Sequence, residues 1–509
     1  MKKLLRNLIL ALTIVAMCCL SSCGFLYDII TPTDSSSSSG SGGDDDFVYV
    51  DEPLDPEIPL LTDLSGGNST YGYEYFANEE RGEYKQAFYS AIEAVARDFE
   101  EGNKNAEYTN ISGRTYAYIV GEVKNDYGLS VDEAISVWKT YRDDNPLAYW
   151  ISTSVYYETT GTSIYLVTDS AYAKASDRNT KKERITKTMS RYVYEAGKYD
   201  TDYEKALCLH DLIISDVNYA YGGDGQPSNE PWAHNIIGVV EKRGVVCEGY
   251  ARTYQLALNL AGVDNVFVTG TGGTGRDSGG HAWNLVNVDG GWYWVDPTWD
   301  DPTRTNNYTS DYPSYDYFMR TDTFLKDHTA HKPTGTNTDY LYGLPARAKR
   351  EYTNDGIWLA GEEIKSGDIA YARLRYDGAE VVNADKKYGG FLGLALQSRT
   401  LEVPESVEYK NRRYAVVAVK ADAFANRTDL TAVTLPSSIK RIRENAFYGC
   451  NNLVTLSVGV GLTHIYSGAF YGCNKLETVN YGGDADAFAA IRVDNGNEKF
   501  TDANAVYGT

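Results

Sequence analysis

The sequence predicts two folded parts, a mixed α+β domain and a C-terminal stack of short repeats, preceded by an export signal and a polar tether. Helical and strand-like patterns alternate between about residues 70 and 345, which is typical of an α+β domain. A 23-residue pattern recurs after residue 421, which indicates a repeat stack. At 509 residues the chain is long enough for two or three separate cores.

Residues 1–22 have the pattern of a secretion signal, with Lys2, Lys3 and Arg6 ahead of an apolar run from Leu8 to Leu20. That run is shorter than the roughly 20 residues of a membrane-spanning helix. It ends in Leu-Ser-Ser-Cys, which resembles the bacterial lipoprotein box and predicts acylation of Cys23 after cleavage. The alternative is an ordinary signal peptide with an incidental cysteine. Acylation would anchor the exported protein to the bacterial membrane, facing the periplasm or the cell exterior.

Residues 23–69 are predicted to be a disordered tether, because the stretch TPTDSSSSSGSGGDDD is polar, acidic and unable to build a core. The whole chain has a formal charge of −22, and removal of residues 1–22 would take away three positive charges and give −25. A surface of this sign repels phosphate backbones, so no nucleic-acid partner is expected. We interpret the acidity as a source of solubility outside the cytoplasm.

Residues 70–200 read as an α/β supporting region with no set of side chains that suggests chemistry. Helices are predicted over 83–102 and 131–146, the second ended by Asn145-Pro146, and a further helix over about 181–197. Residues 149–169 are strand-like with a Thr-Gly turn. We expect this region to support the domain that follows.

Residues 201–345 are predicted to be the catalytic domain, which opens with an amphipathic helix over 202–218. Cys208 and His210 lie beside its apolar face and are interpreted as packing residues. A second helix follows Val246, with a buried stripe headed by Cys247 and a stop at Gly262. The N-terminus of a helix favours a thiolate, and its free N–H groups could hold an oxyanion. Gly244 and Gly249 are expected to allow a close approach to this helix.

A β-hairpin is predicted next, with HAWNLVNV and WYWVDPTW flanking Asp289-Gly290-Gly291. If Asp289-Gly290 is a two-residue turn, Asp296 pairs opposite Trp283 and lies diagonal to His281, so His281 and Asp296 point the same way. A slip by one residue would place them on opposite faces. Three further side chains share that face and are expected to pack on the Cys247 helix: Trp283, Leu285 and Trp294.

Cys247, His281 and Asp296 can supply a nucleophile, a base and a carboxylate that orients the base. The proton of the thiol would pass to His281, and the thiolate would attack an amide carbonyl to give a thioester, which water or an amine resolves. The alternative is that the cysteine, histidine and aspartate have only a structural role, as buried side chains that pack in the core. Trp232 and Trp283 are predicted to contact the substrate, with His234 beside Trp232.

Residues 204–302 resemble the bacterial transglutaminase-like superfamily, on the motifs KALCLHDLI, VVCEGYA and GHAWNLVNVDGGWYWVDPTWDDP. The resemblance implies a papain-like α+β core with a helical N-terminal extension, and it places Cys247, His281 and Asp296 on the Cys, His and Asp of that family. It implies acyl transfer or hydrolysis at a Gln side chain or a peptide bond, with no cofactor, and leaves peptidase and transglutaminase activity open.

No nucleotide or metal site is expected. The glycine-rich stretch 270–281 lacks the Lys-Ser/Thr of a phosphate loop and is interpreted as a mobile loop beside the site. Asp296, Asp300 and Asp301 do not have the spacing of a calcium-binding EF-hand loop, and turn chemistry accounts for the last two.

Residues 346–400 are predicted to be a β-rich connector, and residues 401–509 a leucine-rich repeat solenoid with a C-terminal cap. The repeats align two sets of apolar positions: Phe424, Phe447 and Phe470, and Leu430, Leu453 and Leu476. Their spacing resembles the BspA-type repeats of bacterial surface proteins, which implies binding of a protein partner. Cys450 and Cys473 are equivalent positions, interpreted as buried thiols and not as a disulfide.

The sequence as a whole predicts an exported, lipid-anchored cysteine enzyme that acts on a protein or peptide substrate and carries a binding module. Two alternatives remain open at this point. The first is a surface adhesion or protein-binding lipoprotein with a vestigial triad. The second is an enzyme that cross-links its targets instead of hydrolysing them.

Overall fold

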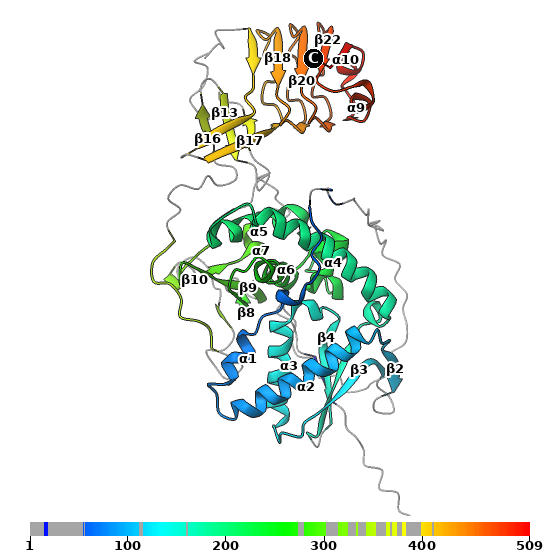
Figure 1. Ribbon diagram of the computed structural model, residues 1–509, viewed down its shortest axis with the longest axis vertical. Helices are drawn as coiled ribbons and strands as arrows, with labels where there is room; N and C mark the ends of the chain where they lie inside the picture. The colour runs from blue at the N-terminus through cyan, green and yellow to red at the C-terminus, as the bar shows by residue number, and fades with distance from the viewer. Residues whose placement is uncertain are drawn as a thin grey trace, which may run out of the picture. The chain divides into compact units, whose positions relative to one another are not determined.

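The computed structural model describes the larger part of the chain, drawn in colour in Figure 1. The described residues are 15–18, 54, 56, 58–110, 116–158, 161–272, 279–301, 314–323, 332–333, 343–352, 363–366, 369–373, 379–382, 399–409 and 412–508. The predicted acylation site Cys23, most of the signal peptide and most of the tether lie outside them. Two compact units are present, the first ending at Tyr352 and the second containing Thr353–Thr509.

The first unit begins with a five-stranded antiparallel sheet in the order β1-β4-β5-β3-β2. Its strands are β1 (Val15–Cys18), β2 (Glu107–Asn110), β3 (Tyr116–Lys124), β4 (Ile151–Tyr157) and β5 (Ser163–Thr168). The strand-like pattern of residues 149–169 is thus a confirmed hairpin, with Gly161 in the left-handed conformation at its turn (φ 73°). No strand was predicted over the residues of β2 and β3.

Helices α2 (Gly82–Glu101) and α3 (Val131–Asp144) pack beside this sheet, and α1 (Tyr71–Phe76) packs on those two helices (Figure 1). The apolar face expected for α2 is confirmed, because Phe88, Ile92 and Phe99 are buried. A capping box starts α3, in which Ser130 accepts from the Glu133 N–H and Glu133 accepts from the Ser130 N–H. The helix ends at Asp144, ahead of the predicted stop at Asn145-Pro146.

The last part of the predicted tether is folded, which corrects the expectation of disorder up to residue 69. Leu64 is buried, and Ser65–Gly67 forms a short 3-10 helix, η1. A Cβ on Gly67 would lie 2.3 Å from Leu256 Cδ1, so this segment lies tightly against the rest of the unit. Leu61 and Leu64 provide apolar surface that this otherwise polar segment can bury against the domain.

Helix α6 (Cys247–Leu260) lies at the centre of the first unit and contacts α4, α5 and the strands β8 and β9 (Figure 1). The surrounding elements are α4 (Ala175–Ala196), α5 (Asp202–Asp216), α7 (Pro297–Asp300), β8 (Asn265–Gly272), β9 (Gly279–Val288), β10 (Gly291–Val295) and β11 (Lys332–Pro333). The four strands form an antiparallel sheet in the order β10-β9-β8-β11. The predicted helix stop is confirmed, because Gly262 has a φ of 74°.

Short elements link these larger ones. They are the 3-10 helices η2 (Pro146–Ala148), η3 (Ser170–Tyr172) and η4 (Pro231–His234), the π-helical turn η5 (Gly238–Lys242), and the parallel pair β6 (Asn218–Tyr219) and β7 (Gly244–Val245). The pairing of β6 with β7 brings the chain to Val246, directly before α6.

The second unit stacks its repeats in register, as the 23-residue period predicts. Ala432 pairs with Thr455 and Thr455 with Thr478, so each parallel partner lies one repeat further along the chain. One ladder of parallel strands contains β15 (Thr400–Glu402), β18 (Ala432–Leu435), β20 (Thr455–Val458), β22 (Thr478–Tyr481) and β24 (Asn504–Tyr507). A second contains β17 (Arg412–Val419), β19 (Arg441–Ile442), β21 (His464–Ile465) and β23 (Arg492–Val493).

The remaining described elements extend these ladders. They are β12 (Glu363–Ser366), β13 (Ile369–Arg373), β14 (Ala379–Val382), which joins β17 in parallel, β16 (Ser406–Tyr409), which joins β17 antiparallel, and the helices α9 (Ala485–Ala489) and α10 (Glu498–Thr501). Part of the predicted 346–400 connector therefore extends the repeat sheet.

Equivalent phenylalanines form the core of the repeat stack. The ring of Phe447 stacks on those of Phe424 and Phe470, with centroids 5.3 and 5.4 Å apart. Cys450 and Cys473 are free and buried, and their thiols donate to the carbonyls of Phe424 and Phe447 at 3.1 and 3.2 Å. Burial raises the pKa of both thiols to about 12. These positions are therefore buried thiols, as predicted.

Candidate functional site

The predicted hairpin register is confirmed. Asp289 and Gly290 both have positive φ, 52° and 78°, as a two-residue hairpin turn requires, and Val288 pairs with Gly291. The last pair, Val295 with Asn284, leads Asp296 to the position across from Trp283. The turn chemistry thus brings Asp296 to the same side of the hairpin as His281.

His281 and Asp296 are in direct contact. His281 Nε2 lies 2.6 Å from Asp296 Oδ2, and the two residues are only 6% and 3% exposed. The other carboxylate oxygen of Asp296 accepts the N–H groups of Thr298 and Trp299 at 3.0 and 3.3 Å, so Asp296 is also the N-cap of α7. One carboxylate therefore orients the imidazole while the start of α7 holds that carboxylate in place.

The imidazole is confined on several sides. Trp283 stacks on it with ring centroids 5.5 Å apart, and the Trp299 ring lies 5.4 Å away. On the neighbouring strand β8, a Cβ at Gly272 would come within 3.0 Å of His281 Cγ. Two aromatic rings and the backbone of β8 therefore crowd the imidazole and limit its movement.

Trp283 does not have the role expected of it. Its side chain is fully buried between His281 and Trp294, so in this structure it supports the imidazole and is not available to a substrate. The predicted contact of its sheet face with the Cys247 helix is also wrong. Trp283, Leu285 and Trp294 form a separate cluster with Tyr71 and Tyr75.

Helix α6 packs on the opposite face of the β8–β9 sheet. Cys247 and Ala251 cluster there with Phe267 and Ala282, and Asn284 Nδ2 donates to the Ala251 carbonyl at 3.1 Å. Neighbouring residues of a strand point to opposite faces, so Ala282 and Trp283 are on different sides. By the same alternation His281 lies on the face of Trp283, so the contact expected between the Cys247 helix and the His281 face of the hairpin is not found among these clusters. Alternation predicted which side chains share a face but not which face the helix covers.

Cys247 is the first residue of α6, as predicted, and is 1% exposed. It meets β9 at Ala282, the neighbour of His281. Gly249 is needed for this packing, because a Cβ there would lie 2.6 Å from the Ala233 carbonyl oxygen. A glycine is not required at Gly244, because a Cβ there would have its nearest neighbouring atom at 3.7 Å, an ordinary van der Waals distance.

A buried ion network holds the first turn of α6. Glu248 contacts Arg252 Nε at 2.9 Å and His234 Nδ1 at 3.3 Å, with Arg142 further out at 3.7 Å. Burial opposes the charge of Glu248, but Arg252, His234 and Arg142 outweigh it and hold its pKa well below the usual range. His234 thus braces the helix that carries Cys247, while its neighbour Trp232 is half-buried, with Lys242 Nζ 5.8 Å from its ring centre.

A second buried network, which sequence reasoning missed, lies behind Asp296. His210 Nδ1 is 3.0 Å from Asp211 and its Nε2 is 3.2 Å from Asp300, the last residue of α7. Burial lowers the pKa of His210, but the two carboxylates outweigh it and raise the pKa to about 9. His210 is fully buried among aromatic rings, as a packing residue would be, but it also pairs with two carboxylates, and Asp300 supplies one of them from the end of α7. The His-Asp pair at 210–211, inside an otherwise apolar helix face, was the signal that could have found it.

Asp301 is also buried, and Tyr250 of α6 donates to its carboxylate. The predicted glycine-rich loop is shorter than expected, because residues 270–272 end β8 and 279–281 begin β9; residues 273–278 lie outside the described ones. Within the described part of the chain no cluster of three His, Cys, Asp or Glu side chains could hold a metal. No described helix has the length and apolar character needed to cross a membrane.

Comparison with known families covers both units. Residues 188–297, which include Cys247, His281 and Asp296, match the model of the Transglutaminase-like superfamily. Residues 413–489 match the BspA type Leucine rich repeat region, in six copies. The chain carries a transglutaminase-like domain. Its core is mixed helix and sheet with N-terminal helices, and the leucine-rich repeats follow.

Similar proteins share only parts of this chain. Kyphoscoliosis peptidase of Homo sapiens is 26% identical over 187 residues, 35% of this chain and 27% of that protein. Its Mus musculus counterpart is 31% identical over 159 residues, 29% of this chain and 22% of that protein. The chain therefore spans about a quarter of the length of these curated relatives.

Solved structures match each unit separately. One described as a TGase is 18% identical and covers 33% of this chain and 46% of its own, with a TM-score of 0.22. A leucine-rich repeat protein from Bacteroides capillosus is 25% identical and covers 26% of this chain and 87% of its own, also with a TM-score of 0.22. The family match of the transglutaminase-like domain supports an enzyme of the cysteine hydrolase or transferase type.

Proposed function

We propose that the transglutaminase-like domain cleaves or transfers amide groups of a protein or peptide substrate through a thioester on Cys247. The observation that carries the proposal is the 2.6 Å contact between His281 Nε2 and Asp296 Oδ2, on a strand whose next residue, Ala282, packs with Cys247 at the start of α6. Nε2 contacts the carboxylate, and we assign the removal of the thiol proton to the other ring nitrogen, Nδ1.

The reaction has two halves. In the first, His281 removes the Cys247 proton, the sulfur bonds to the amide carbon, and the departing amine takes that proton as the C–N bond breaks. N–H groups at the start of α6 hold the oxyanion while it exists. In the second, water or an amine attacks the thioester, His281 takes its proton, and the thiol is restored with that proton. Water gives hydrolysis, and an amine gives cross-linking.

The rest of the chain suggests where this chemistry takes place. The signal-like residues 1–22 and Cys23 support export and lipid anchoring to the bacterial membrane, and the repeats support recognition of a protein partner. Cleavage before Cys23 would remove β1 from the edge of the first sheet and leave the other four strands. Trp232, half-buried and near the start of α6, is proposed to border the substrate path. No cofactor takes part in this scheme.

The test is the relative reactivity of two buried cysteines towards iodoacetamide at neutral pH. Cys247 and Cys208 are 1% and 4% exposed, so burial does not favour either. Activation by His281 predicts rapid labelling of Cys247, slow labelling of Cys208, and loss of the rapid phase in Cys247→Ala. Equal rates for the two thiols would contradict the proposal.

A catalytically silent, protein-binding surface protein is the second candidate, favoured by the near-complete burial of Cys247 and by the repeats. Mass analysis of peptide products with and without an added amine separates the enzymatic outcomes. Identical product profiles for the wild type and Cys247→Ala on every substrate would leave the silent protein as the answer.

A further inference from the structure

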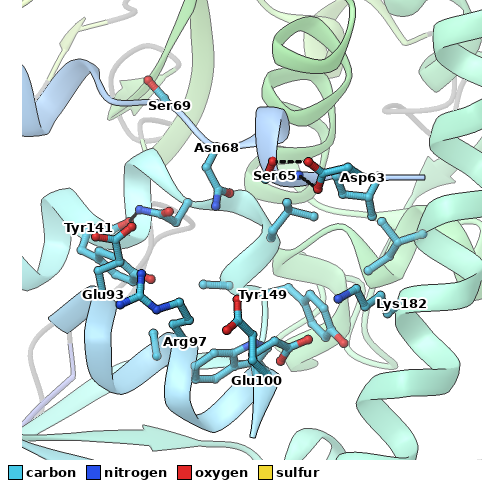
Figure 2. A pocket seen from close by; sticks show the side chains of 18 of the residues that line it. Asp63, Ser65, Asn68, Ser69, Glu93, Arg97, Glu100, Tyr141, Tyr149 and Lys182 are labelled. Carbon is cyan, nitrogen blue, oxygen red and sulfur yellow. Dashed lines mark hydrogen bonds between the residues drawn. The ribbon is translucent and has the colours of Figure 1, made fainter. Parts of the chain in front are cut away.

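A cavity of about 660 Å³ opens in the first unit, in the region expected only to support the catalytic domain. It lies between the segment 61–70, helix α2, the end of α3 and helix α4 (Figure 2). Its size is that of a small-ligand site. Nothing in the proposed thioester chemistry uses it.

The cavity is separate from the triad. The segment 61–70 that borders it touches the last turns of α6, where a Cβ at Gly67 would meet Leu256 and Leu260. Cys247 begins the same helix nine residues before Leu256, which at 1.5 Å per residue is about 14 Å away along the axis. A ligand here would therefore not touch the thiol.

The wall formed by this segment is fixed. The N–H of Leu61 donates to Ser190 Oγ at 2.9 Å, Asn259 Nδ2 donates to the Gly67 carbonyl at 2.8 Å, and the N–H of Ser69 donates to the Asp144 carbonyl at 2.7 Å. Three anchors on three different helices hold the wall. The cavity is thus formed without a ligand, which lowers the cost of binding.

Charged side chains of both signs border the cavity from opposite sides. Glu93 and Arg97 of α2 lie on one side near Tyr141, and Lys182 of α4 lies on the other near Asp63 (Figure 2). Among the described residues, the side chains of Glu93, Arg97 and Lys182 have no hydrogen-bond partner and no ion-pair partner within 4 Å.

Two other carboxylates of the cavity are already engaged. Asp63 accepts the N–H and O–H of Ser65 at 2.8 and 2.6 Å, and Glu100 lies 3.4 Å from Arg178 Nε. Glu101 also lines the cavity, and Arg97 follows Glu93 by one turn of α2. The α2 side therefore carries both signs, while Lys182 is a cation of the α4 side. Glu93 and Lys182 lie on opposite sides (Figure 2), as a ligand that carries both signs requires.

The floor of the cavity is aromatic. Tyr149 and Trp150 line it with 8% and 2% of their surface exposed, and Tyr141 beside Arg97 with 5%, so a ligand would contact only a small part of these rings. Aromatic surface of this kind favours apolar or aromatic side chains of a ligand. Ligand sites are commonly lined by aromatic side chains, with a few polar groups that orient the ligand.

We infer that this cavity binds a short peptide with free ends, its ammonium group at Glu93, its carboxylate at Lys182 and an apolar side chain on Tyr149 and Trp150. A neutral oligosaccharide could contact the same rings, but it has no charge with which to pair Glu93 or Lys182. The volume suits a peptide of about two to four residues. Binding does not depend on the chemistry proposed for Cys247.

The test is calorimetric titration of the full chain carrying Cys247→Ala, which prevents turnover of the probe. The probe is the tripeptide Ala-Leu-Tyr, compared with its N-acetylated form, its C-amidated form and maltotriose. We expect the free tripeptide to bind and each capped form to bind about three- to tenfold more weakly, since each cap removes one partly exposed charge pair. Maltotriose is expected not to bind.

Two variants assign the binding to this cavity and not to the triad. Glu93→Gln should abolish the difference between the free and N-acetylated peptides, and Lys182→Gln the difference between the free and C-amidated ones. Both side chains are exposed, so the variants should unfold at the wild-type temperature. The inference is overturned if the free peptide does not bind, if capping has no effect, if the variants keep both preferences, or if only maltotriose binds. An unreactive Cys247 would leave all these results unchanged.

Discussion

Asp296 and Asp300 occupy the two ends of the one-turn helix α7, and each holds a histidine. Asp296 contacts His281 at 2.6 Å, while Asp300 contacts the buried His210 at 3.2 Å. The backbone of α7 links them, since the N–H of Asp300 donates to the Asp296 carbonyl at 3.3 Å. The carboxylate that orients the proposed base is therefore braced from a second, fully buried charge cluster.

The two roles of Asp296 can be separated by two substitutions. Asparagine keeps an oxygen that can accept the Thr298 and Trp299 N–H groups, but it replaces the carboxylate facing His281. Asp296→Asn should therefore lower the alkylation rate of Cys247 about tenfold or more, with little change in stability. Asp296→Ala should lose the same reactivity and in addition about 1 kcal/mol of unfolding free energy. Wild-type reactivity in Asp296→Asn would contradict the role of the carboxylate.

The His210 cluster predicts a stability profile at alkaline pH. The pKa of His210 is raised from its ordinary 6.5 to about 9, so its protonated form is favoured in the folded state. The resulting stabilisation is complete below pH 6.5 and is lost as the pH rises through about 9. Urea unfolding of the first unit should thus weaken between pH 7 and 10, by at most about 1.4 kcal/mol per pH unit.

His210→Gln should remove that pH dependence and lower the unfolding free energy at pH 7 by about 3 kcal/mol, because Asp211 and Asp300 lose their shared cation. The matched control is His464→Gln. His464 also pairs with a carboxylate, that of Asp494 at 3.0 Å, but near the surface of the second unit, so we expect a loss below about 1 kcal/mol. A flat wild-type profile from pH 7 to 10 would show that His210 is not charged.

The repeat stack predicts that substitutions at two adjacent residues, Phe447 and Tyr448, differ strongly in their effect on stability. Phe447 is fully buried between two stacked rings, whereas Tyr448 is 40% exposed. Phe447→Ala should cost the second unit about 3–5 kcal/mol of unfolding free energy through the cavity it leaves. Tyr448→Ala should cost less than about 1 kcal/mol. Similar losses in the two variants, measured by urea unfolding, would contradict the stacked arrangement.

Local rules were enough where the decisive contacts are local. The Asp289-Gly290 turn sets the hairpin register, and two-residue alternation then brings Asp296 to His281, all within 16 residues of sequence. The 23-residue period likewise carries the pairing of the repeats. Alternation alone could not say which face of the sheet α6 covers, so the placement of Trp283 against that helix was wrong.

Long-range contacts account for the rest of what was missed. His210 meets Asp300 across 90 residues, and nothing near either one predicts the other. The cavity was not predicted for the same reason. Its wall is held by contacts between residues far apart in the sequence, such as that of Leu61 with Ser190, 129 residues apart. Such pairs depend on how α4 to α7 pack, which helix periodicity does not reveal.

Gly272 offers the most direct test of how tightly the proposed base must be held. A methyl group at this position would lie 3.0–3.1 Å from three atoms of the His281 side chain, so the ring would have to move by some tenths of an ångström. Gly272→Ala should therefore slow alkylation of Cys247 by about tenfold, because the proposed proton transfer from the thiol depends on the position of the imidazole. Its effect on unfolding free energy should be modest, about 1 kcal/mol. Gly223→Ala is the matched control, since a Cβ there would meet nothing within 4 Å. If both variants react as fast as the wild type, His281 does not activate Cys247 from the position it occupies.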